Sequence, residues 1–167
     1  MVEPLQPGEV VINNQSDKKG LLLSWQHPVS HRHAVLEELD GMAWLYLTNP
    51  GKLDPKRDCP AFATRPLTVE KVDMNAVSKL GAPPPISKDV ASPEAVITGV
   101  VPGNLNTVWS EDGESVGLLY KGRIIAMIVS SATQGHSRAL ELASPFGLPF
   151  DEGLANLVFG VGAVTEK

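Results

Sequence analysis

Three of the four histidines in this 167-residue chain lie close together, at His27, His31 and His33. Imidazole is the commonest metal-binding side chain, so the group predicts a metal site to which Glu37 could add an oxygen. The spacing is unfavourable, because His31 and His33 would point to different sides of a helix, and the HExxH spacing is absent. The alternative is a polar loop leading into a helix, with its histidines solvated or hydrogen-bonded.

A second candidate site is the polar segment 130–138, which leads from an apolar strand into an expected helix. Free backbone N–H groups at a helix start attract anions, and hydroxyls, a glycine and an arginine accompany them here. A histidine beside serines could also support nucleophilic chemistry, although neither a GxSxG elbow nor a Walker loop is present. The alternative is ordinary helix capping by Ser and Thr. We predict an anion- or substrate-binding site formed by Ser131, Thr133, His136, Ser137 and Arg138.

The single cysteine, Cys59, allows no intramolecular disulfide and no cysteine-based zinc cluster within one chain. Its neighbours Lys56 and Arg57 would favour a thiolate, whereas Asp58 would oppose one. We therefore expect an inert thiol. No motif identifies a cofactor, so the cofactor is left unknown.

The elements that must position these residues centre on the segment 106–130, in which two glycine-containing turns separate three runs of strand-forming residues. Gly113 and Gly122 supply the positive φ that tight hairpins require, so we predict a three-stranded antiparallel meander. The runs 116–120 and 124–129 are apolar without alternation, which indicates a sheet covered on both faces.

The second turn of the meander also fixes an expected register. If Lys121 and Gly122 form a two-residue loop, Tyr120 pairs with Arg123. Leu118 then lies opposite Ile125.

The rest of the chain suggests further strands and helices. Residues 95–101 stay open between strand and helix, because a helix start precedes a β-branched run. Further strands are expected at 9–12, 21–26, 42–48 and 61–65, and helices at 29–39, 68–80, 136–143 and 151–158. We therefore predict an α+β fold: a mixed or mainly antiparallel sheet centred on the meander, with two to four short helices packed on it. It should form a single domain over 1–167, with a proline-rich, linker-like segment at 81–93.

Composition narrows the class of protein. The net charge of −5 and the lack of a basic stripe argue against nucleic-acid binding. No apolar run approaches the ~18 residues that span a membrane, and the N-terminus lacks the pattern of a signal peptide. We expect a soluble cytoplasmic protein.

Two classes of function remain. We expect a non-enzymatic module that binds a protein partner or associates with itself, because no catalytic constellation or cofactor loop is present. The alternative is a small hydrolase or transferase, or an anion-binding sensor, that combines the 130–138 loop with His27, His31 and His33. This alternative requires the two regions to meet in space.

Overall fold

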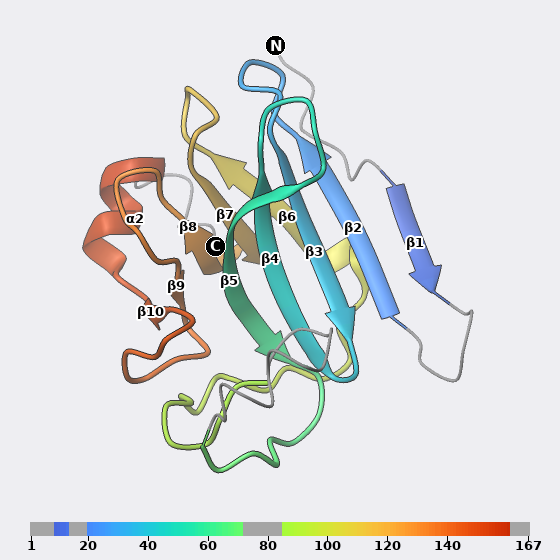
Figure 1. Cartoon of the computed structure of the whole chain (residues 1–167), viewed down its shortest axis with the longest axis vertical. Coiled ribbons are helices and arrows are strands. Elements are labelled where there is room, and N and C mark those ends of the chain that lie inside the picture. Colours follow the sequence, from blue (N-terminus) through green and yellow to red (C-terminus); the bar gives the residue numbers. More distant parts are fainter. Residues whose placement is uncertain (1–8, 14–19, 72–84, 161–167) are drawn as a thin grey trace.

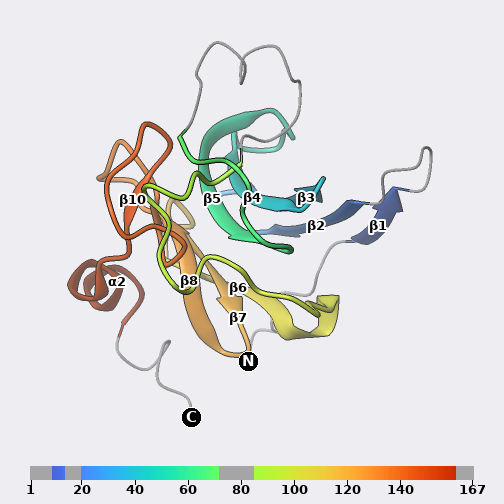
Figure 2. The ribbon, with the colours of Figure 1, turned by 90° about the horizontal axis from the view of Figure 1, so that it is seen from below.

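The computed structural model describes residues 9–13, 20–71 and 85–160. Two β-sheets pack face to face, and Figure 2 shows them as two layers, β2 to β5 in one and β6 to β8 in the other. No described helix is long and apolar enough to cross a membrane.

In the first sheet, the order of the strands follows the order of the chain, and every neighbouring pair is antiparallel (Figure 1). A two-residue turn joins β3 to β4, with Asp40 at φ 56° and Gly41 at φ 86°, as hairpins that match the strand twist require. The strands are β1 (Glu9–Asn13), β2 (Gly20–Gln26), β3 (His33–Leu39), β4 (Met42–Thr48) and β5 (Pro55–Ala63).

The second sheet has the order β10-β9-β8-β7-β6. Its pairs are antiparallel except β9 with β10, which is parallel. A 3-10 turn, η1 (Pro102–Asn104), leads into it, and the helix α2 (Glu152–Phe159) follows it. The strands are β6 (Leu105–Trp109), β7 (Val116–Tyr120), β8 (Arg123–Ile128), β9 (His136–Ser137) and β10 (Leu148–Pro149).

The core lies between the two sheets, and a smaller apolar cluster lies under α2. Burying each large aliphatic side chain contributes roughly 1.5–3 kcal/mol. α2 covers the other face of the second sheet, where Ala155 packs with Ile124, Met127 and Val129. Both faces of β8 are therefore covered, which explains its unbroken apolar sequence. The shared core includes Leu23, Trp25, Leu36, Leu45, Val116, Leu118, Ala126 and Ile128.

The predicted meander is present as β6, β7 and β8, and Tyr120 pairs with Arg123 as expected. The expected pairing of Leu118 with Ile125 is wrong. A register shift between Leu118 and Leu119 places Leu118 opposite Ala126. A bulge adds an unopposed residue to one strand, and neighbouring glycines do not reveal its position.

The α+β prediction is wrong, because the described residues form two sheets with a single α-helix. The expected helix at 29–39 is a turn followed by β3. Ala34 and Leu36 are buried while Val35 between them is not, which is the period of a strand. The sequence is also compatible with a helix, because Val35, Leu36 and Leu39 would share one helical face.

The expected helix at 136–143 is also wrong. His136 and Ser137 form β9, and the backbone N–H of Arg138 donates to the carbonyl of Ile125 at 2.9 Å. Pairing with the free edge of β8 satisfies these backbone groups outside a helix.

The other predicted segments have different outcomes. Most of the helix expected at 68–80 lies outside the described residues, and its described part, 68–71, is not helical. Residues 95–101 form neither helix nor continuous strand, and Val96 makes one isolated bridge to Ala63. The described part of the linker-like segment, 85–93, includes Ile86, which is buried against the first sheet.

The helix expected at 151–158 is confirmed as α2, whose N-cap Asp151 accepts from the backbone N–H of Leu154 at 3.0 Å. Asp151→Ala should lower the free energy of unfolding by about 0.5–2 kcal/mol, because that N–H loses its acceptor. Asp151→Asn keeps an acceptor at the same position and should cost less. Urea denaturation of both variants measures this, and equal losses would contradict the capping role.

Candidate binding groove and the predicted site residues

His27 closes the turn between β2 and β3. Its backbone N–H donates to the carbonyl of Arg32 at 3.0 Å, and its carbonyl accepts from the backbone N–H of His31 at 3.0 Å. The residue is 8% exposed, and its Nδ1 accepts from the backbone N–H groups of Val29 and Ser30 at 3.1 and 3.3 Å. The imidazole is thus part of the turn that it belongs to.

The His27 ring also contacts the second sheet. Its centroid lies 5.2 Å from that of Trp109, and Gly113 packs against it so closely that a Cβ there would approach Nδ1 to 2.5 Å. Burial lowers the pKa of His27, against the opposing effect of Asp112 and Glu114. Because Nδ1 accepts hydrogen bonds, the proton of the neutral ring lies on Nε2. This is not the arrangement of a general base, whose Nδ1–H donates to an orienting carboxylate.

The predicted metal site gains no support. His31 is exposed, whereas His33 has a buried Nδ1 without a hydrogen-bond partner in the described part of the chain. Among the residues that the structure describes, no three His, Cys, Asp or Glu side chains are grouped to hold a metal ion.

The residues predicted for the anion site divide between two environments. Ser131 and Thr133 are exposed on the loop, whereas His136 and Ser137 are buried on β9. The hydroxyl oxygen of Ser137 accepts from the backbone N–H of Ala139 at 3.0 Å. The hydroxyls therefore lie partly in solvent and partly in the interior.

Arg138 fastens α2 to the second sheet. Its Nε donates to the carbonyl of Ile124 at 2.6 Å, its Nη1 lies 2.8 Å from Glu152, and its guanidinium stacks 3.8 Å over the ring of Phe150. The hydrogen bond from Arg138 lowers the pKa of Glu152. The one cation of the predicted anion site thus has a carboxylate partner of its own.

His136 and Cys59 are buried together between β5 and β9. The thiol of Cys59 donates to the carbonyl of His136 at 3.4 Å, and a Cβ on Gly135 would approach its Sγ to 2.7 Å. Burial raises the pKa of Cys59 and lowers that of His136. The thiol is therefore protonated and inaccessible, as the sequence predicted for an inert cysteine.

The His27 turn and the 130–138 loop approach the same hairpin turn, 110–115, from two sides. Gly113 packs on His27, and the hydroxyl of Ser115 accepts from the backbone N–H of Ser130 at 2.8 Å. These contacts position the turn. In them, neither His27 nor Ser115 has the hydrogen-bond partners that a nucleophile and its base would have.

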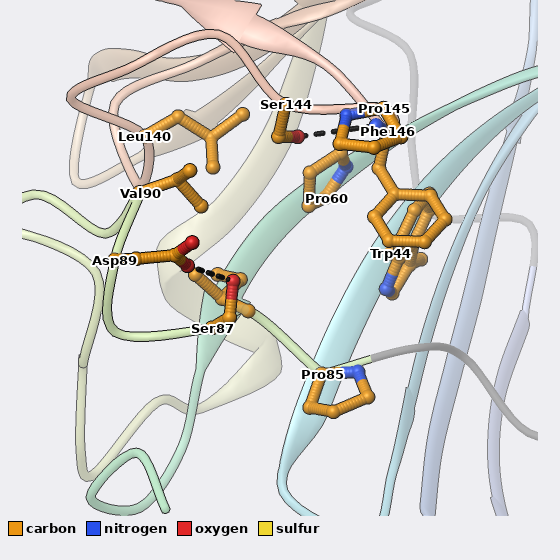
Figure 3. Close-up of a pocket in the computed structure, with 11 residues that line it drawn as sticks. Trp44, Pro60, Pro85, Ser87, Asp89, Val90, Leu140, Ser144, Pro145 and Phe146 are labelled. Carbon is orange, nitrogen blue, oxygen red and sulfur yellow. Dashed lines mark hydrogen bonds between the residues drawn. The ribbon is translucent and has the colours of Figure 1, made fainter. Parts of the chain in front are cut away.

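A small cavity lies beside Trp44 and Phe146, whose rings meet edge to face with their centroids 5.7 Å apart (Figure 3). Ser87 and Asp89 on its rim bond to each other at 2.5 Å. Its volume is about 50 Å³. One water occupies about 30 Å³ in the liquid, so the space suits a water or two but not a metabolite.

A larger groove, of about 490 Å³, lies on the face of the first sheet that points away from the second sheet. Strand register builds it, because Leu22 pairs with Glu37, and Ser24 pairs with Val35, which pairs with Tyr46. The loop before β5 completes it. Two leucines remain open to solvent on its wall, Leu22 at 38% and Leu53 at 66%. The lining consists of Leu22, Leu23, Ser24, Val35, Glu37, Tyr46, Leu53 and Pro55.

One side of this groove is acidic. Glu37 is part of its lining, and Asp58 lies beside it as the cross-strand neighbour of Tyr46 on β5. Burial, Glu37 and Asp58 all raise the pKa of Tyr46, and burial also raises the pKa of Asp58. The ion pairs found among the described residues involve neither of these carboxylates.

The groove was not predicted from the sequence, in which Glu37 stood on an expected helix as a possible metal ligand. Its residues come from β2, β3, β4 and the segment 53–55, and they become neighbours only once the register is known. The available signal was the alternation of Ala34, Val35 and Leu36 between two faces. Comparison with protein-family models, with curated proteins and with solved structures found no match to the chain.

Proposed function

We propose that this protein is a non-enzymatic binding module that holds an extended segment of a partner protein in the groove over β2, β3 and β4. The groove itself is the observation that carries the proposal. Its volume of about 490 Å³ lies within the usual range of roughly 300–1,000 Å³ for ligand sites. Its lining has five apolar residues and three polar ones, Ser24, Glu37 and Tyr46, which is the mainly apolar composition of ligand sites.

The energetics favour a peptide-like occupant. Leu22 and Leu53 are exposed side by side with the partly buried Val35, so a partner would remove apolar surface from water at roughly 25 cal/mol per Å². Tyr46 supplies a rigid aromatic anchor with a polar end, the residue type enriched where binding energy concentrates. An extended segment would present every second side chain to the groove.

The rival, a hydrolase, transferase or anion sensor built on the 130–138 loop and the histidines, lacks a comparable observation in its favour. His27 uses its Nδ1 within its own turn, and Arg138 is paired with Glu152. A second copy of this chain as the occupant is a separate outcome that the experiment below distinguishes.

The test titrates isotope-labelled protein with a synthetic peptide of alternating leucine and lysine, about six residues long, the usual length of one strand. We expect saturable changes in amide chemical shift confined to β2, β3, β4 and residues 53–55. The double variant Leu22→Ala, Leu53→Ala should weaken binding about tenfold, because the partner loses two apolar contacts.

The matched control is Val29→Ala with Leu142→Ala, which truncates two apolar residues that are 67% and 57% exposed and lie outside the groove. It should leave the affinity unchanged. Absence of binding up to about 1 mM peptide, or shifts centred elsewhere, would refute the proposal. Sedimentation that shows a dimer formed through the groove would replace the peptide by a second copy.

A further inference from the structure

We infer that the groove selects a partner segment carrying a lysine or arginine, whose cationic end is received between Glu37, Tyr46 and Asp58. This inference rests on the proposed function and names the chemistry of the partner. It assigns a role to the acidic side of the groove, which the apolar contacts do not explain.

The first argument is geometric. β3, β4 and β5 lie side by side in that order (Figure 1), so Glu37 and Asp58 flank the strand that carries Tyr46. Burial and the charges of Glu37 and Asp58 raise the pKa of Tyr46, because both carboxylates lie near its phenol. Two carboxylates are therefore held beside one aromatic ring, and a ring face also attracts ammonium and guanidinium groups.

The second argument is that the charge is uncompensated. Four ion pairs occur in the described part of the chain, and they use Glu114, Glu70, Glu94 and Glu152. Neither Glu37 nor Asp58 forms an ion pair with a described residue, and Asp58 is exposed beside the groove, with partial burial raising its pKa. A partner's cation would therefore meet two carboxylates that no described cation neutralises.

The third argument is long-range. The chain carries a net charge of −5, which attracts cationic segments and repels acidic ones before contact. Charge complementarity of this kind sets partner choice and association rate more than total affinity. A basic and apolar segment satisfies both sides of the groove, whereas a wholly apolar segment leaves the two carboxylates against uncharged atoms.

The test compares three peptides of equal length, in which leucine alternates with lysine, glutamine or glutamate. We expect the lysine peptide to bind about tenfold more tightly than the glutamine peptide at low salt, and the glutamate peptide more weakly than either. The preference for lysine should shrink toward about 1 M salt, because exposed charges are screened there.

Two variants locate the preference. Glu37→Gln and Asp58→Asn should each weaken the lysine peptide about two- to fivefold while leaving the glutamine peptide unchanged. Glu111→Gln, an exposed carboxylate at the 110–115 turn, is the matched control and should alter neither. Asp58→Asn should also keep or raise the melting temperature, because no ion pair or side-chain hydrogen bond to a described residue depends on its carboxylate. A carboxylate that served only the fold would instead lower it when replaced.

The outcomes distinguish this inference from the proposed function. Equal affinity for the lysine and glutamine peptides, with shifts in the groove, overturns this inference and leaves the proposed function standing. A lysine preference that survives both variants also overturns it, because the cation would then bind elsewhere. If none of the peptides binds, the proposed function fails and this inference fails with it.

Discussion

Replacing Gly113 with alanine should lower the free energy of unfolding by about 3–4 kcal/mol. Gly113 has φ 73°, and the left-handed region costs an L-residue roughly 1–2 kcal/mol. Its new Cβ would also lie 2.4 Å from the hydroxyl of Ser30 and 2.5 Å from Nδ1 of His27. Relieving such overpacking typically costs about 1–3 kcal/mol. Urea denaturation, followed by circular dichroism, measures the loss.

Gly122 provides the matched control for this change. It also has a positive φ, 82°, but a Cβ there meets nothing within 4 Å. Gly122→Ala should therefore cost only the backbone term, about 1–2 kcal/mol. If the two variants were equally stable, the close contact between the 110–115 turn and the His27 hairpin would be refuted.

Replacing Arg57 with methionine should lower the free energy of unfolding by about 3–5 kcal/mol. Arg57 leaves β5 and spreads its guanidinium over the segment that follows β8. It donates to the carbonyls of Val129, Ala132 and Ser130 at 2.5, 2.8 and 2.9 Å. Hydrogen bonds from a charged donor contribute about 1.5–3 kcal/mol each, and three that share one side chain add to less than their sum. The same denaturation measurement applies.

Two further variants isolate the role of the guanidinium. Arg57→Lys keeps the charge but loses the planar fork, so it should recover less than half of the lost stability. Lys56→Met removes an exposed cation from the neighbouring position of the same strand and should change stability by less than about 0.5 kcal/mol. A loss below about 1 kcal/mol for Arg57→Met would show that these hydrogen bonds do not hold the loop.

The parts of the fold that could be predicted are those that short stretches of sequence determine. Gly113 and Gly122 give the turns of the meander, and Asp151 gives the start of α2, because each acts on neighbouring backbone. The bulge beside Leu118 was not predictable, because it depends on how two strands fit together across the sheet.

The wrong helices have a common physical cause. At 29–39, Val35, Leu36 and Leu39 fit one helical face, yet Ala34 and Leu36 fit one face of a strand equally well. Pairing with β2 and β4 decided between the two. At 136–143, the open edge of β8 offered backbone partners that no local pattern could reveal.

The candidate site was the least predictable part. The histidines and the Ser/Thr-rich loop attracted attention because their residue types often do chemistry, but in the structure His27 and Arg138 make contacts that hold the fold. The groove consists of residue types, such as those of Leu22 and Tyr46, that do not by themselves indicate a site. They form one only because they share a face of the sheet. Register is a property of the assembled sheet, and a single sequence does not disclose it.

The buried position of Cys59 makes its thiol a natural reporter of local opening in this protein. It is the sole thiol of the chain, and Gly135 and β9 cover its Sγ. A thiol reagent in excess can modify only molecules in which β9 has separated from β5. The rate of modification therefore reports how often the contact between β5 and β9 opens. The opening equilibrium of the contact between β5 and β9 can thus be followed in the natural sequence, without introducing a probe.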